Sequence, residues 1–234
     1  MYALTSIRPN EDLVRYLQHP IIQSIRHDGE KYSFCPTGGG ARVVRSGLLS
    51  KLKKVFYPDF EYKRRRHRGE RKRKGSSRAQ GISLDNQVFA YINGKYKKSA
   101  LRHRYSKALV QYLEDQIGHT LQAAQVPVYV HHFRCVTQAD LITQDKEGRL
   151  FVWELKTGYN QCQKQGFLTA IPGETIPNNR KNQWELQRHF TTMGLTDVGL
   201  KLSGSQVLNI YDETDGKITV RRRKRPTWID KLKL

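Results

Sequence analysis

The chain lacks the features that would place it across a membrane or in a disulfide-bonded extracellular fold. Hydrophobic residues make up 37% of its 234 residues. It has no run of about 18 apolar residues, the shortest length that spans a bilayer as a helix. Its N-terminal residues have no apolar core of the kind that a secretory signal needs. The cysteines Cys35, Cys135 and Cys162 are too few and too widely spaced for a disulfide framework. We therefore expect an intracellular protein in a reducing compartment.

Acidic residues are scarce beside basic ones, and this imbalance is the strongest signal in the composition. The chain has 42 Lys and Arg against 21 Asp and Glu, a formal net charge of +21. Lys and Arg that neutralise phosphates release condensed counterions, which drives binding to nucleic acid of any sequence. An anionic membrane could use the same charge, but the sequence has no basic amphipathic helix with an apolar face and no lipidation motif. The charge therefore predicts a nucleic-acid partner and no membrane.

The basic residues concentrate in two short segments. Residues 63–74 read KRRRHRGERKRK and cannot be buried, so we expect a solvated arm that contacts phosphates. A second cluster, Arg221 to Arg225, follows a β-prone run and could extend the same track. A nuclear address, a solubilising run or a charged tail would have the same composition, and Tyr159 could be a core residue instead of a base-stacking one. The residues that we expect at nucleic acid are Arg64, Arg65, Arg66, Arg71, Arg73, Arg78, Tyr159, Arg222 and Arg223.

The hydrophobic pattern predicts one α/β domain with additions at both ends. Apolar residues recur at helical spacing in some segments and form short β-prone runs in others. Helices are predicted near residues 81–92, 99–117 and 182–193, and strands at 126–130, 133–136, 207–211 and 218–220. The expected divisions are an N-terminal lobe (1–60), a basic arm (61–77), a catalytic core (78–220) and a basic tail (221–234).

The N-terminal lobe is predicted to hold a helix, a hairpin and a loop. The helix covers Glu11–Gln18 and should be stopped by Pro20. The hairpin joins Ile21–Ile25 to Lys31–Phe34 through an Asp-Gly turn. The three glycines from Gly38 to Gly40 form a loop without the Gly-Lys-Ser/Thr of a phosphate-binding Walker motif.

A second hairpin carries the candidate chemistry. Residues 137–158 contain two β-prone runs on either side of the turn Asp145-Lys146-Glu147-Gly148. A turn centred near residue 147 places Asp140 opposite Glu154, with their Cβ atoms about 4.5–5.5 Å apart. Strand alternation puts Val152, Glu154 and Lys156 on one face, and Phe151, Trp153 and Leu155 on the other.

These side chains are suited to a divalent cation. Two ionised carboxylates repel each other at this distance unless a cation lies between them. Oxygen ligands favour Mg²⁺ or Mn²⁺, which lower the pKa of a bound water and stabilise charge on a phosphodiester. The ammonium of Lys156 could hold the attacking water or the charged phosphate.

Asp140 followed by Glu154-Leu155-Lys156 resembles the signature of the PD-(D/E)XK nuclease superfamily, with Ala139 in place of a variable proline. The chain is also similar to the RecB-like and lambda-exonuclease-like branch, because residues 81–85, Gly-Ile-Ser-Leu-Asp, open a helix upstream. The resemblance makes Asp85 a candidate third carboxylate. It also points to a glutamine helix at residues 182–187, where Gln187 is the candidate, although Gln183 is an alternative because the usual Gln-x-x-x-Tyr is not intact.

The resemblance implies a restriction-endonuclease-like core, a central mixed β-sheet flanked by helices, with an N-terminal extension. It implies Mg²⁺-dependent hydrolysis of DNA, with Mn²⁺ able to substitute, and in this branch action on ends or single strands. The implied metal ligands are Asp85, Asp140 and Glu154, and the implied catalytic residues are Asp140, Glu154, Lys156 and Gln187. The alternatives are an endonuclease of a virus or mobile element, a nuclease for RNA, and a non-catalytic nucleic-acid-binding protein with a degenerate core.

Overall fold

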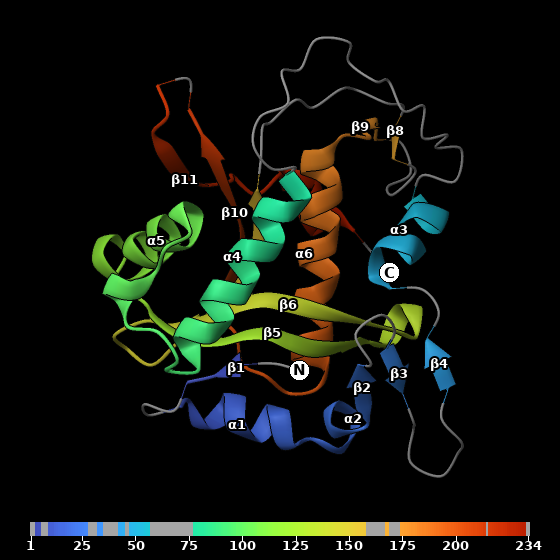
Figure 1. Ribbon diagram of the computed structural model, residues 1–234. Coiled ribbons are helices and arrows are strands. Elements are labelled where there is room, and N and C mark those ends of the chain that lie inside the picture. The colour runs from blue at the N-terminus through green and yellow to red at the C-terminus, as the bar shows by residue number, and fades with distance from the viewer. Residues whose placement is uncertain are drawn as a thin grey trace.

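A mixed β-sheet forms the centre of the fold in the computed structural model, which describes residues 3–5, 9–27, 32–34, 42–44, 47–56, 77–157, 167–168, 174–213 and 215–232. The strand order is β1-β5-β6-β7-β10-β11 (Figure 1). β7 and β10 run parallel, and the other neighbours are antiparallel. The strands are the two-residue β1 (Ala3–Leu4) and the five longer strands β5 (Thr120–Val130), β6 (Cys135–Gln144), β7 (Leu150–Thr157), β10 (Gly204–Asp212) and β11 (Ile218–Arg222).

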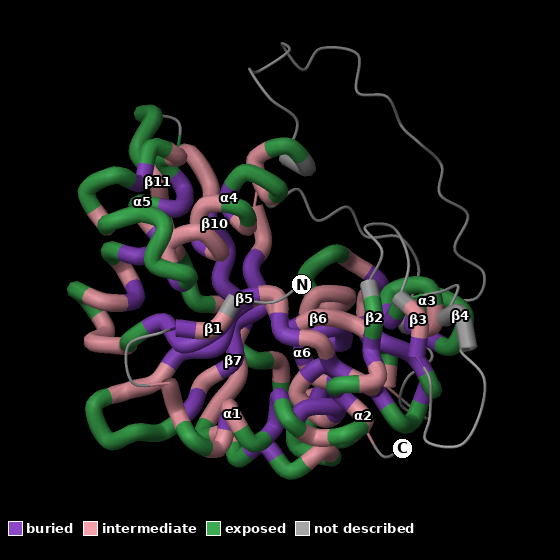
Figure 2. The backbone as a smooth tube through the Cα atoms, turned by 60° about the horizontal axis from the view of Figure 1, so that its bottom comes forward, coloured by how far each residue is buried: buried purple, intermediate pink, exposed green. Residues whose placement is uncertain are grey.

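Helices cover both faces of this sheet, so the predicted α/β class is confirmed. The helices are α1 (Glu11–Gln18), α2 (Pro20–Gln23), α3 (Leu48–Phe56), α4 (Ser77–Ile92), α5 (Arg104–Gln111) and α6 (Arg180–Asp197). The first core cluster, which we call the α6-side core, joins α6 and the three N-terminal helices to one face. The second, the α4-side core, joins α4 and α5 to the other. Figure 2 shows the buried residues along the central strands between these layers. Within the described residues, no helix is long and apolar enough to cross a membrane.

The turn between β6 and β7 forms where the sequence predicts it. Asp145 Oδ1 accepts hydrogen bonds from the backbone N–H groups of Glu147 (3.1 Å) and Arg149 (2.8 Å). Gly148 has a φ of 81°, a left-handed conformation that costs glycine little. The sequence of the turn therefore fixes how the two strands meet.

Pro20 begins a helix instead of only ending one. The first helix ends at Gln18 as predicted, but α2 starts at Pro20, because proline lacks the N–H that a first helical position leaves unbonded. The predicted strand from Ile21 is therefore wrong. β2 (Ile25–His27), β3 (Tyr32–Phe34) and β4 (Arg42–Val44) form a small separate sheet. The predicted Asp-Gly turn and Gly38 to Gly40 lie outside the described residues.

Several elements of the core begin or end elsewhere than predicted. α4 starts at Ser77, and the predicted helix at 99–117 is a shorter α5 continued by a π-helical turn at Tyr112–Gln116. Phe133 lies in a 3₁₀ turn and not in a strand. Arg221 and Arg222 belong to β11, so the predicted start of the tail falls inside a strand. Beyond it, Ile229 is buried in the α6-side core, which holds the described end of the chain against the fold. A two-residue pair, β8 (Phe167–Leu168) with β9 (Ile176–Pro177), precedes α6.

Candidate active site

The hairpin of β6 and β7 has the predicted register. Leu141 pairs with Trp153, and Ile142 pairs with Val152, so the next position along β6, Asp140, lies across from Glu154. Val152 packs in the α6-side core and Trp153 in the α4-side core. Glu154 therefore shares the α6 side of β7 with Val152, as the alternation predicts.

The regular alternation of side chains along β6 and its neighbour β5 is interrupted at Asp140. Ala139 lies in the α6-side core and Leu141 in the α4-side core, although residues two apart on a regular strand point to the same side. Across the ladder, Gln125 of β5 has a φ of 54°, and the alternation of β5 changes there as well. Asp140 therefore lies at an irregular position of β6, and the sequence pattern does not predict this irregularity.

The backbone pairing of β6 with β7 ends next to Asp140, and the carboxylate of Asp140 accepts a backbone hydrogen bond there instead. Asp140 Oδ2 accepts a hydrogen bond of 2.7 Å from the backbone N–H of Leu155. The carboxyl groups of Asp140 and Glu154 lie within hydrogen-bonding reach of each other. The hairpin therefore brings the two predicted acids together.

Lys156 is held between β7 and α6. Its Nζ donates to Glu154 Oε1 and, over 3.2 Å, to Gln187 Oε1. Glu154 is only 2% exposed and Gln187 is 9% exposed. The Nε2 of Gln183 instead donates to Asn178 Oδ1. Of the two candidate glutamines, the structure places Gln187 at the site.

Burial and mutual repulsion change the acidity of these groups. Burial, together with Asp140, raises the pKa of Asp85 to about 7, against the opposing effect of Lys156. Burial and Asp140 likewise raise the pKa of Glu154 to about 8. Burial raises the pKa of Asp140, although Lys156 and the Leu155 N–H act against it. Burial lowers the pKa of Lys156, but the carboxylates of Glu154 and Asp140 outweigh it and hold this pKa above its ordinary value.

The donor set fits a hard divalent cation in its chemistry. Asp85 of α4 and Glu154 each interact electrostatically with Asp140 at a half-buried to buried site, and Lys156 is the cation that interacts with all three. Among the described residues, however, no three His, Cys, Asp or Glu side chains converge closely enough to form a ready-made metal site. Glu154 forms an ion pair with Lys156. The three predicted ligands are therefore near one another but do not yet converge on one point as metal ligands would.

Asn209 is a further polar residue at this site that the sequence analysis did not single out. It is the partner of Lys156 in the parallel ladder of β10 with β7, and paired residues there point to the same face of the sheet. Asn209 is 1% exposed, and neither polar atom of its side chain has a hydrogen-bond partner among the described residues. The one signal in the sequence was an asparagine inside the apolar run Val207–Ile210.

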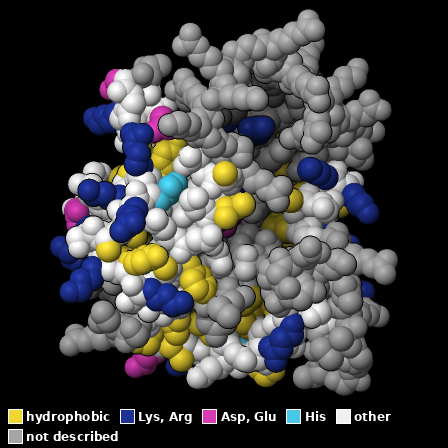
Figure 3. All heavy atoms as spheres, viewed as in Figure 1, with side chains coloured by type: hydrophobic (Ala, Val, Ile, Leu, Met, Phe, Trp, Pro, Cys, Tyr) yellow, Lys and Arg dark blue, Asp and Glu magenta, His cyan; other side chains and the backbone are white. Residues whose placement is uncertain are grey.

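The residues predicted at nucleic acid are only partly described. Arg222 lies on β11 with its guanidinium 5.4 Å from the ring of Trp153, and Arg223 lies 5.0 Å from the ring of Trp184. Figure 3 shows Lys and Arg spread over the visible face with few acids among them. Arg78 lies in the first turn of α4, but its side chain is outside the described part of the structure. Also outside it are Arg64, Arg65, Arg66, Arg71, Arg73 and Tyr159.

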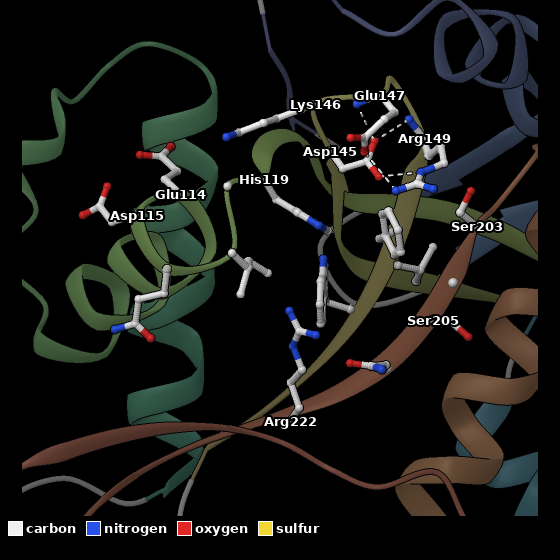
Figure 4. Close-up of a pocket in the computed structure, with 18 of the residues that line it drawn as sticks. Glu114, Asp115, His119, Asp145, Lys146, Glu147, Arg149, Ser203, Ser205 and Arg222 are labelled. Atoms are coloured by element: carbon white, nitrogen blue, oxygen red, sulfur yellow. Dashed lines mark hydrogen bonds and ion pairs between the residues drawn. The ribbon is translucent and has the colours of Figure 1, made fainter.

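A pocket of about 810 Å³ lies at the other end of the hairpin. It is bounded by the turn at Asp145–Arg149, by residues 114–119 and by the start of β10, and Arg222 reaches into it (Figure 4). Asp140, Glu154 and Lys156 do not line it. The pocket and the cluster of acids are therefore two separate sites, which lie along different parts of β7.

Comparison of the chain with protein-family models, with curated proteins and with solved structures finds no match. The class that the structure itself defines is an α/β protein with a mixed sheet between helices. Its site is a pair of facing acids with a lysine and a glutamine beside them.

Proposed function

We propose that this protein is a metal-dependent nuclease of the PD-(D/E)XK type, with a restriction-endonuclease-like core, that hydrolyses phosphodiester bonds of DNA. The observation that carries the proposal is the convergence of Asp140, Glu154 and Lys156 at the point where β6 and β7 separate. The net charge of +21 supports a polyanionic substrate.

Asp140 and Glu154 would hold Mg²⁺, with Asp85 as a third ligand and Mn²⁺ as a substitute. When bound, the ion would lower the pKa of a water ligand and offset charge on the phosphate. Asp140 is suited to this role because the N–H of Leu155 fixes one of its oxygens, Oδ2, and holds the carboxylate beside that of Glu154. Glu154 would have to exchange its contact with Lys156 for the ion.

Lys156 would act as the fixed cation of the reaction. The carboxylates around it hold its pKa above the ordinary value, so it keeps its charge at neutral pH. Gln187 accepts from Nζ and thereby aims the ammonium at the acids. A positioned charge in a partly dry site can orient a water or stabilise a phosphorane-like transition state. Asn209, beside it, can hold a water.

The preference for ends or single strands rests on the resemblance to the RecB-like and lambda-exonuclease-like branch. An endonuclease would use the same residues, and a nuclease for RNA would differ in its contacts to the 2′-hydroxyl. A non-catalytic nucleic-acid-binding protein is the candidate of a different class, and the basic composition alone would suit it.

Cleavage assays separate these functions. End-labelled and internally labelled DNA, as single strands and duplexes, would be incubated with Mg²⁺, Mn²⁺ or EDTA. We expect cleavage that needs the metal and falls by about 10²–10³-fold in Lys156→Ala and in Glu154→Gln, the size of effect seen when one group that stabilises a transition state is removed. Gln187→Ala should lose activity while Gln183→Ala, one turn earlier on the same helix, should retain it. Cleavage that survives Lys156→Ala and Glu154→Gln would defeat the assignment, and binding without cleavage in any metal would favour the binding protein.

A further inference from the structure

The pocket at the turn end of β7 has the size and lining of a ligand site, and the proposed cleavage reaction does not use it. Its volume of about 810 Å³ lies in the range of about 300–1,000 Å³ that is usual for such sites. Aromatic rings form part of its wall. The ring centroids of His119 and Phe151 are 4.7 Å apart, and those of His119 and Trp153 are 5.8 Å apart.

The acids of the lining are already held by basic side chains. Asp145 and Glu147 are bound by Arg149, and Glu114 and Asp115 by Lys98. Arg225 is bound by Asp230. Two cations of the lining, Lys146 and Arg222, form no ion pair within the described part of the chain. They stand on opposite sides of the pocket, with His119 between them (Figure 4). Lys98 and Arg149 each pair with two acids, so the charges around the pocket balance. Arg222 and Lys146 are the cations left for an anionic group of a ligand.

Arg222 is positioned for a phosphate. Its guanidinium carbon lies 5.4 Å from the ring of Trp153 and 5.9 Å from that of Tyr112. Contacts to ring faces hold a guanidinium in place while its N–H groups remain available, and their planar arrangement matches phosphate oxygens. Gln206 also lines the pocket, and in the described part of the chain its Oε1 has no hydrogen-bond partner. An amide can turn about its last side-chain bond, so Gln206 can offer a donor or an acceptor to a base.

We propose that this pocket binds an unpaired nucleotide, with the base against the rings of His119 and Phe151 and phosphates at Arg222 and Lys146. Rings with interspersed cations are the usual means of binding single strands, because every base has a face that stacks. A base inside a duplex cannot enter. The inference rests on the proposed function for its context, since it makes an unpaired strand the substrate that the nuclease holds.

Binding can be measured without cleavage by using the full chain with Glu154→Gln as the background. Fluorescence anisotropy would be recorded with a labelled ten-nucleotide single strand and with the matching duplex. Arg222→Ala should weaken binding of the single strand by about 10-fold or more and binding of the duplex by no more than about 2-fold, because only the single strand uses the pocket. Arg221→Ala is the matched control, since this neighbouring exposed arginine does not line the pocket. It should change both affinities by the same small factor.

Two further measurements test whether a folding defect explains the result and whether the bound nucleotide is free or part of a strand. Gln206→Ala should also weaken the single strand selectively, with an unchanged melting temperature. Unlabelled dAMP that displaces the strand at micromolar concentration would show that a free nucleotide suffices, whereas displacement by an unlabelled strand alone would show that the polymer is needed. Either result supports the pocket. Equal losses in Arg222→Ala and Arg221→Ala, or equal losses for duplex and single strand, would overturn it. Because cleavage is absent from this assay, a failed nuclease proposal would appear separately, as intact binding by a wild-type protein that never cuts.

Discussion

Arg188 and Glu185 form an ion pair within α6 that is closed off from water. Arg188 Nε donates to Glu185 Oε2 over 2.8 Å, and the two side chains are only 2% and 4% exposed. Arg188 Nη1 also donates to Ser205 Oγ on β10. The pair thus ties α6 to the sheet directly beside Gln187. Arg188→Met would leave the charge of Glu185 buried without a partner, which costs about 3–5 kcal/mol in comparable cases.

The double variant Glu185→Leu/Arg188→Met should recover most of this loss. Apolar side chains of similar volume often replace a buried pair at no net cost, and none of the residues that the structure describes forms a hydrogen bond with Arg188 Nη2. For a chain of this length each kcal/mol corresponds to about 2–4 °C in melting temperature, so the single variant should melt about 6–20 °C lower.

Urea denaturation of the wild type, both single variants and the double variant gives the coupling between the two side chains. A loss below about 1 kcal/mol in Arg188→Met would show that the pair behaves like an exposed one. A double variant as unstable as the sum of the single variants would show that the two side chains do not interact. Either result would refute the reasoning.

Three further predictions concern His189, Asn209 and Gly194. Burial, more than nearby arginines, lowers the pKa of His189 to about 4, so the contribution of this side chain to stability is complete above about pH 6.5 and is lost as the pH falls toward 4. In urea titrations, His189→Phe should therefore reduce the loss of stability between pH 7 and pH 5 by about 1 kcal/mol, after allowance for solvent screening. An unchanged pH dependence in this variant would contradict the prediction. Asn209→Leu removes a buried amide that has no hydrogen-bond partner within the described ranges. It should stabilise the fold by about 1 kcal/mol and lower kcat for the proposed cleavage. A variant that is both less stable and fully active would disprove the role proposed for Asn209. Gly194→Ala would place a Cβ 2.6 Å from Tyr129 O and 2.7 Å from Val128 Cγ1, so it should cost about 1–3 kcal/mol, and an unaltered urea midpoint would show that α6 and β5 can move apart freely.

The hairpin of the site could be predicted because its signals are local. An Asp-Gly-bounded turn fixes the register, and a period of two then assigns Glu154 and Val152 to the same face. The structure has this register. The position of Gln187 beside Lys156 was implied only by the resemblance, since no periodicity within a helix shows which distant strand it meets.

The remaining features depend on contacts between distant segments. The break in the pleat at Asp140 needs the left-handed Gln125 of the facing strand, and a glutamine gives no sign of that conformation. The role of Asn209 depends on the parallel register of β10 with β7, which is set by the crossover through α6. Pro20 does not by itself show whether a strand or a helix follows, because a proline that ends one helix can equally be the first residue of the next.

β7 has neighbours on both sides, β6 and β10, and it carries the lysine and glutamate of the site. Amides in such a strand exchange with solvent only when the whole sheet opens. In a nascent or partly unfolded copy with free strands, Glu154 and Lys156 would not be held beside Asp140, so the cleavage that we propose would require the completed sheet.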